Sequence, residues 1–171
     1  LSRTAAAVVE RMDAYDNYAA CAHITHFVDA LSNWYVRRSR DRFWRAIQNA
    51  ECTIQKSEFS AADQDKWDAY NTLYEVLLAL SKLIAPFTPF FAETMYQNLA
   101  GTRALRHAGT QAADSEAAPL RPLSVHLSDY PEPDAAAIDE RLSRVMGAVR
   151  ELVSLGREVR TATQLRVRQP L

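Results

Sequence analysis

The 171-residue sequence has few of the features that mark membrane, secreted or nucleotide-loop proteins. No apolar run approaches the roughly 20 residues needed to cross a bilayer, so a membrane-spanning protein is excluded. Cys21 and Cys52 are too few for a disulfide framework, and we expect a reducing, cytoplasmic setting. Four glycines argue against a Gly-built nucleotide loop. The chain shows no secretory signal and does not begin with Met, so we expect a piece of a longer protein.

The composition is that of a soluble globular domain, with 48% hydrophobic and 24% charged residues. The net charge of −1 conceals an uneven pattern, because the 20 basic residues are concentrated in two stretches. Residues 37–45 hold five arginines against Asp41, and residues 141–168 hold seven arginines against two acids. Two basic stretches on a neutral protein favour local binding of a polyanion, although arginine-rich solvated helices are also common.

Apolar residues at helical spacing predict an all-α bundle of four to five helices. Expected N-terminal signals are Asp13 or Asp16, the Ser60–Asp63 pair, and Thr88 followed by Pro89. Gly101 is expected to end the helix that begins at Phe90. The predicted helices are 1–13, from Asp13 or Asp16 to about residue 40 or 44, from about residue 60 to before Pro86, 90–99, and five turns from Ile138.

The remaining stretches lack helical periodicity. Residues 49–59 are predicted to form a loop, and residues 101–123 an exposed, variable and poorly ordered one. Residues 124–127 and 165–171 alternate polar and apolar side chains, which predicts short extended pieces. We therefore expect a helical domain over residues 1–163 and the start of a truncated C-terminal extension over residues 164–171.

Catalytic and metal-binding patterns are weak. His23 and His26 stand three apart near Cys21, but no second pair of ligands follows at zinc spacing. We expect helix histidines and no metal site. No Gly-x-Ser-x-Gly elbow, P-loop or Gly-x-Gly-x-x-Gly motif is present, so no catalytic residue is predicted.

Residues 31–44 combine arginine and aromatic side chains. On an uninterrupted helix, Trp34 continues the apolar stripe of Ala20, Ile24, Phe27 and Leu31, and we expect it in the core. The opposite side carries Asn33, Arg37, Arg40 and Trp44 at steps of four, three and four. Arginine pairs with phosphate or a base edge and stacks on bases, so this side is a candidate RNA surface. A solvated face with ion pairs to Asp29 and Asp41 is the alternative.

These residues also carry a family resemblance. The segment 31–44 (LSNWYVRRSRDRFW) resembles the signature helix of the anticodon-binding domain of isoleucyl-tRNA synthetases. Residues 73–77 (LYEVL) and 83–93 (LIAPFTPFFAE) agree, although the latter marks class I synthetases in general. The segments 124–127 (SVHL) and 167–171 (VRQPL) are similar to the isoleucyl pattern. The valyl relative usually has an acid where Arg37 or Arg38 stands, which disfavours it.

The resemblance implies a domain that grips the anticodon stem-loop of tRNA-Ile within an enzyme that joins isoleucine to tRNA using ATP and Mg²⁺. That chemistry belongs to other domains, so no cofactor is expected in this chain, whose partners are tRNA-Ile and the remaining domains. His23–His26 imitates the family's His-Ile-Gly-His motif, but Thr25 replaces the glycine. Alternatives are another aliphatic synthetase, such as valyl, or a helical module that binds an acidic protein. The candidate RNA-binding residues are Asn33, Arg37, Arg38, Arg40, Arg42, Trp44, Arg45, Arg166 and Arg168.

Overall fold

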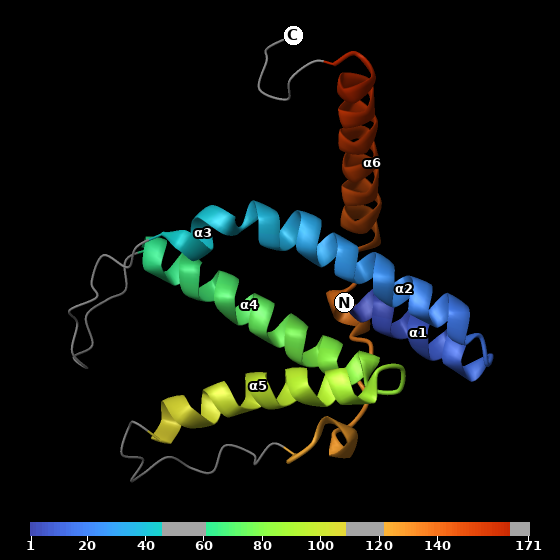
Figure 1. Cartoon of the computed structure of the whole chain (residues 1–171). Coiled ribbons are helices and arrows are strands. Elements are labelled where there is room, and N and C mark those ends of the chain that lie inside the picture. Colours follow the sequence, from blue (N-terminus) through green and yellow to red (C-terminus); the bar gives the residue numbers. More distant parts are fainter. Residues whose placement is uncertain (46–60, 109–121, 165–171) are drawn as a thin grey trace. The chain divides into compact units, whose positions relative to one another are not determined.

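The computed structural model describes residues 1–45, 61–108 and 122–164, with side chains omitted for 101–108. The described residues form helices and turns without strands, which confirms the all-α class (Figure 1). The chain divides into two compact units, Leu1–Pro133 and Asp134–Leu171. None of the described helices is long and apolar enough to span a membrane. The predicted loop at 49–59 and the extended piece at 165–171 lie outside the described residues.

The first unit begins with a helical hairpin of α1 (Ser2–Asp13) and α2 (Asn17–Ala30). Asp16, and not Asp13, is the N-cap of α2, because its carboxylate accepts a hydrogen bond from the Ala19 N–H at 3.0 Å. Tyr15 in the intervening turn has a φ of 58°, a left-handed conformation that reverses the chain within three residues.

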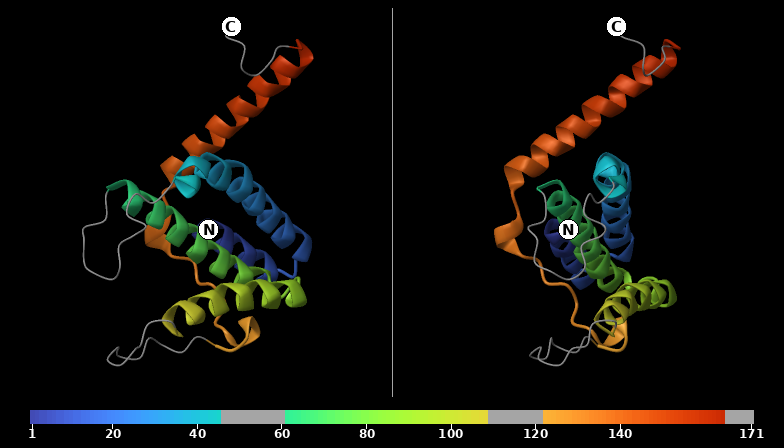
Figure 2. Two further views of the ribbon diagram at one scale, coloured as in Figure 1. Left: turned by 60° about the vertical axis from the view of Figure 1, so that its left-hand side comes forward. Right: turned by 90° about the vertical axis from the view of Figure 1, so that its left-hand side faces the viewer.

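A second helical pair consists of α4 (Ala61–Ile84) and α5 (Pro89–Ala108), which meet at a corner and contact each other (Figure 2). Pro89 opens α5 as predicted. The Thr88 hydroxyl donates back to the Ile84 carbonyl at 3.4 Å. The predicted stop at Gly101 is wrong, because α5 continues to Ala108. A glycine inside a helix costs only about 1 kcal/mol relative to alanine, so it does not by itself end one. Residues 109–121 of the predicted 101–123 loop lie outside the described residues.

The segment after the loop is fastened to α5 by polar side chains. The Glu93 carboxylate accepts hydrogen bonds from the Ser124 hydroxyl and the Val125 N–H, both at 2.9 Å. Val125 is buried, and it begins a 3₁₀ turn, η2 (Val125–Leu127), capped by the Ser124 hydroxyl. The extended piece predicted at 124–127 is therefore wrong: the alternation reflects one inward side chain in a turn.

The core of this unit lies between the two helical pairs. Val8 and Leu83 are fully buried, and Tyr96 is almost so. The predicted stripe on α2 loses burial along its length: Ala20 and Ile24 are buried, Phe27 and Leu31 partly buried, and Trp34 is of intermediate exposure. The expectation that Trp34 lies in the core is therefore met only in part.

The second unit contains a short 3₁₀ turn, η3 (Ala135–Ala137), and the helix α6 (Glu140–Ala162). Asp134 and Asp139 each cap one of them with a carboxylate oxygen, at 2.9 Å and 2.8 Å from the bonded N–H. The five-turn helix predicted from Ile138 is confirmed with a start two residues later. The boundary predicted near residue 163 stays a prediction, because residues 165–171 lie outside the described part.

Candidate nucleic-acid interface

The arginine-rich segment is built from three helical pieces, and not from one uninterrupted helix. The end of α2 passes into a π-helix, η1 (Leu31–Val36). Arg37 and Arg38 are helical, Ser39 forms a buried turn, and α3 (Arg40–Trp44) follows. A π-helix is rare and is frequently found at functional sites, and its wider turn shifts side chains relative to the α-helical phase. The assumption of one uninterrupted α-helix over residues 31–44 was therefore wrong.

The inner side of this segment is anchored on the first turns of α4 by aromatic residues. The Tyr35 hydroxyl donates to the Ala69 carbonyl at 3.1 Å, and the Tyr70 hydroxyl donates to the Phe43 carbonyl at 3.3 Å. The Phe43 and Tyr70 rings pack with centroids 5.0 Å apart. Lys66 adds a hydrogen bond from its ammonium to the Arg45 carbonyl at 2.6 Å. These contacts fix the position of α3 along α4 (Figure 1).

Two of the predicted arginines are paired with one aspartate of α4. Arg42 contacts Asp65 through Nη2–Oδ1 at 2.8 Å and Nε–Oδ2 at 3.1 Å, and Nη2 also donates to the Asp65 carbonyl at 3.0 Å. Arg45 Nη1 lies 3.8 Å from Asp65 Oδ2. The hydrogen bond to Asp65 raises the pKa of the Arg42 guanidinium. Arg42 therefore holds α3 to α4, and Asp65 neutralises much of its charge.

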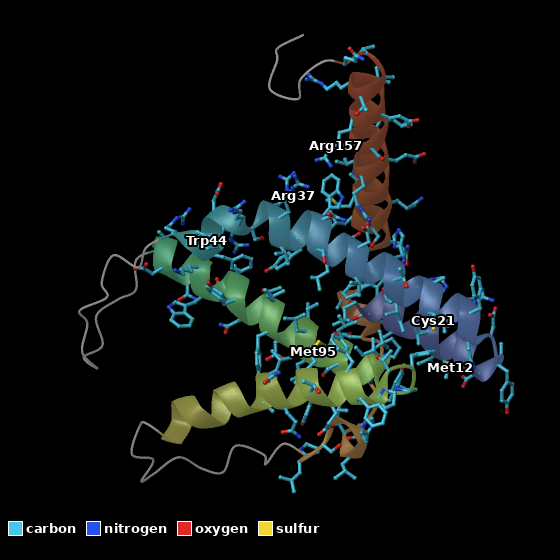
Figure 3. All side chains as sticks on the ribbon, viewed as in Figure 1. Met12, Cys21, Arg37, Trp44, Met95 and Arg157 are labelled. Atoms are coloured by element: carbon cyan, nitrogen blue, oxygen red, sulfur yellow. The ribbon has the colours of Figure 1, made fainter. Side chains whose placement is uncertain are left out.

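Three other arginines present their charge to solvent. Arg37, Arg38 and Arg40 are exposed. Within the part of the chain that the structure describes, none of the three forms an ion pair. Figure 3 shows the Arg37 side chain on the side of its helix that faces away from α4. These are the groups with charge available for a phosphate.

Arg40 and Trp44 combine a cation with an aromatic ring. The Arg40 guanidinium carbon lies 6.0 Å from the Trp44 ring centroid, and Trp44 is 79% exposed. Such a contact is worth about 0.5–1 kcal/mol at an exposed site, which pre-orients the pair without burying it. Asn33 is exposed too, and its amide donates to Asp29 Oδ1 at 2.6 Å, so part of its hydrogen-bonding capacity is used within the helix.

The chain's relatives bear directly on this surface. Residues 1–171 match the family model described as the anticodon-binding domain of tRNA ligase. The chain belongs to this family of anticodon-binding domains. It is 44% identical to an isoleucine–tRNA ligase of Dehalococcoides mccartyi over 160 residues, which is 94% of this chain. It is 41% identical to the enzyme of that name from Chlamydia trachomatis serovar D over 95% of this chain. It is 40% identical to that of Bacillus thuringiensis over all 171 residues of this chain. The chain spans about 13% of the length of these relatives.

The remaining two predicted residues belong to the second basic stretch. Arg166 and Arg168 lie outside the described residues. Most of the second basic stretch belongs to α6 in the other unit, where Arg141, Arg144 and Arg157 are exposed. Arg157 is labelled in Figure 3.

The histidine motif has an ordinary helical explanation. His23 and His26 are exposed on α2, and the Thr25 hydroxyl between them donates to the Cys21 carbonyl at 2.9 Å. Among the described residues, no group of three metal-capable side chains comes together.

Sequence reasoning missed the residues that hold the arginine-rich segment, residues 31–45, against α4. Tyr35 and Phe43 were available as aromatic residues eight positions apart, a spacing close to two helical turns. Asp65 and Tyr70 gave no local signal, because their partners are 23 and 27 residues earlier in the chain.

Proposed function

We propose that this domain binds the anticodon stem-loop of tRNA-Ile as part of a cytoplasmic isoleucine–tRNA ligase. The observation that carries the proposal is the separation of the arginines into anchored and available groups beside an exposed tryptophan. Arg37 and Arg38 contact backbone phosphates, since they are exposed and form no ion pair within the described residues. Isoleucine as the amino acid is supported by the similarity to isoleucine–tRNA ligases over at least 94% of the chain.

The Arg40–Trp44 pair supplies a surface for an unstacked base. Single-stranded RNA bases stack on aromatic rings and on guanidinium planes, and both are present here within 6.0 Å. Asn33 contributes the edge of its amide, and Arg45 adds charge at the end of α3. Arg42 is a positioning residue, since its contacts with Asp65 hold α3 in place. Arg166 and Arg168 remain candidate contacts near the second basic stretch.

ATP and Mg²⁺ act in other parts of the proposed ligase. The His23–His26 motif does not fit the nucleotide. His23–His26 lies within α2, whose backbone N–H groups are used by the helix and cannot cradle a phosphate. This domain's contribution to the joining of isoleucine to tRNA is therefore to orient the tRNA.

The proposal is tested by comparing three ligands for the 171-residue chain. Fluorescence anisotropy is measured with labelled anticodon stem-loops of tRNA-Ile and tRNA-Val, and with an acidic peptide of equal charge, at one fixed salt concentration. We expect the tRNA-Ile stem-loop to bind at least tenfold more tightly than either competitor. Equal binding of the two stem-loops would assign the domain to general tRNA contact, and preference for the peptide would replace RNA by a protein partner.

A further inference from the structure

The corner between α4 and α5 carries large apolar side chains on its outer surface. Phe90 and Phe91, in the first turn of α5, are 89% and 64% exposed, and Leu127 in η2 is 71% exposed. We call these three residues the corner patch. Together they expose on the order of 400 Å² of apolar surface, which is the size of patch that marks interaction sites on soluble proteins.

The course of the chain after residue 122 brings Leu127 to the same corner as the two phenylalanines. Val125 is bonded to Glu93 on α5, and the Tyr130 hydroxyl donates to the carbonyl of Leu83, near the end of α4, at 3.1 Å. The segment between them therefore crosses from α5 to the end of α4. Leu127 lies on this crossing, in a turn that contacts both helices.

The corner patch is held rigidly although its side chains point outward. The Tyr96 hydroxyl donates to the Pro122 carbonyl at 3.0 Å, and the Gln97 amide donates to the Leu123 carbonyl. Three side chains of α5 and one of the segment itself, which bonds to a backbone carbonyl of α4, thus fix a short connection whose apolar residue is left in solvent. A pre-organised apolar surface loses little entropy on binding, which suits a stable protein interface.

The chemistry of the corner disfavours RNA. Residues 83–93 and 122–130 contain no Arg or Lys, and Lys82 and Arg121 directly precede the two ranges, so the corner patch itself offers no cation to a phosphate. The arginine-rich segment, residues 31–45, packs on α4 near Asp65, whereas the corner follows Ile84 at the other end of that helix. Nineteen residues of α-helix separate these positions by about 28 Å. Both surfaces can therefore be occupied at once.

We propose that the corner patch is the docking surface for another domain of the same synthetase polypeptide. This inference rests on the proposed function, which makes the chain part of a longer ligase. The chain covers about 13% of the length of its isoleucine–tRNA ligase relatives, so most of such an enzyme is available to cover the patch. A covalently linked domain has a high effective concentration, which makes a patch of this size sufficient.

The test uses site-resolved thiol labelling of the full-length ligase in the absence of RNA. Leu127→Cys is compared with Tyr18→Cys, a matched control that is 88% exposed in the first turn of α2. Mass spectrometry reports the rate of maleimide labelling at each introduced thiol, apart from the native cysteines. We expect labelling at position 127 to be at least tenfold slower than at position 18.

A second measurement guards against a local effect of the thiol. Phe90→Asp is expected to lower the melting temperature of the full-length ligase by several degrees, and Tyr18→Asp to leave it unchanged. Equal labelling at the two positions, or protection that appears only after tRNA is added, overturns the proposal. Protection that falls on dilution, with a dimer in light scattering, assigns the patch to a second copy instead. Because the expected protection is measured before any tRNA is added, that result is independent of whether residues 31–45 bind tRNA-Ile.

Discussion

Removing the charge of Arg37 is expected to change the salt dependence of RNA binding without changing the stability of the protein. Arg37 is exposed and forms no ion pair within the described residues. We therefore expect Arg37→Ala to leave the stability of the free protein nearly unchanged. Each phosphate contact with single-stranded RNA contributes a slope of about −0.7 to the logarithm of affinity against the logarithm of salt concentration. The parent chain should therefore lose about 2.6-fold more affinity than the variant over a fourfold rise in salt.

The double variant Arg37→Ala, Arg40→Ala extends the same reasoning. Two lost contacts flatten the slope by about 1.4, which is about sevenfold over a fourfold rise in salt. The assay is a titration of the anticodon stem-loop at four or more salt concentrations between about 50 and 200 mM. Thermal unfolding of each variant is recorded in parallel.

Two further variants make the result interpretable. Arg11→Ala removes an exposed charge from the end of α1 and should leave the slope unchanged. Arg42→Ala should lower the melting temperature, because it removes three contacts with Asp65, and should change the slope less than Arg37→Ala does. A parental slope in the Arg37 variants would refute the assignment of this surface to RNA. A slope that Arg11→Ala flattens equally would show only a general charge effect.

Three other outcomes are expected. Glu93→Gln should lower the urea midpoint at pH 7. Hydrogen bonds from the Gln97 amide and the Val125 N–H lower the pKa of Glu93, so its stabilisation is present above the ordinary glutamate pKa and is lost as the pH falls through the lowered value; a difference between parent and variant that does not shrink on acidification would contradict this. Leu83→Ala should cost about 2–5 kcal/mol of unfolding free energy, measured by denaturant titration, because the side chain is fully buried; a cost below 1 kcal/mol would contradict the packing. The 171-residue chain should show no isoleucine-dependent ATP–pyrophosphate exchange, and measurable exchange would overturn the assignment of activation to other domains.

Local signals were sufficient for much of the fold. The carboxylate of Asp16 and the ring of Pro89 mark helix starts by their own chemistry, and apolar spacing gave α1, α4 and α6. Signals that depend on neighbours in space were not readable. Ser124–Leu127 alternates like a strand, yet Glu93 holds it as a turn, and the partner lies 31 residues earlier in the sequence.

The candidate site was predicted in composition but not in geometry. The arginine and aromatic content of residues 31–45 pointed to RNA, and the structure leaves Arg37, Arg40 and Trp44 exposed. The predicted faces of the helix were wrong from η1 onward, because helical periodicity assumes 3.6 residues in every turn. The role of Arg42 could not be separated from that of Arg37 either, since only the fold brings Asp65 beside it.

The π-helix η1 also makes the domain sensitive to the length of its chain at this place. A π turn contains one residue more than an α turn, so η1 takes up one residue that α-helical winding would pass on to the rest of the segment. If the same residues wound as an α-helix, everything after them would turn by about 100° and shift by about 1.5 Å relative to α2. The hydrogen bond from Tyr35 to Ala69 and the ion pair of Arg42 with Asp65 would lose their register together. The register of both contacts therefore depends on the π winding of η1 being matched to its number of residues.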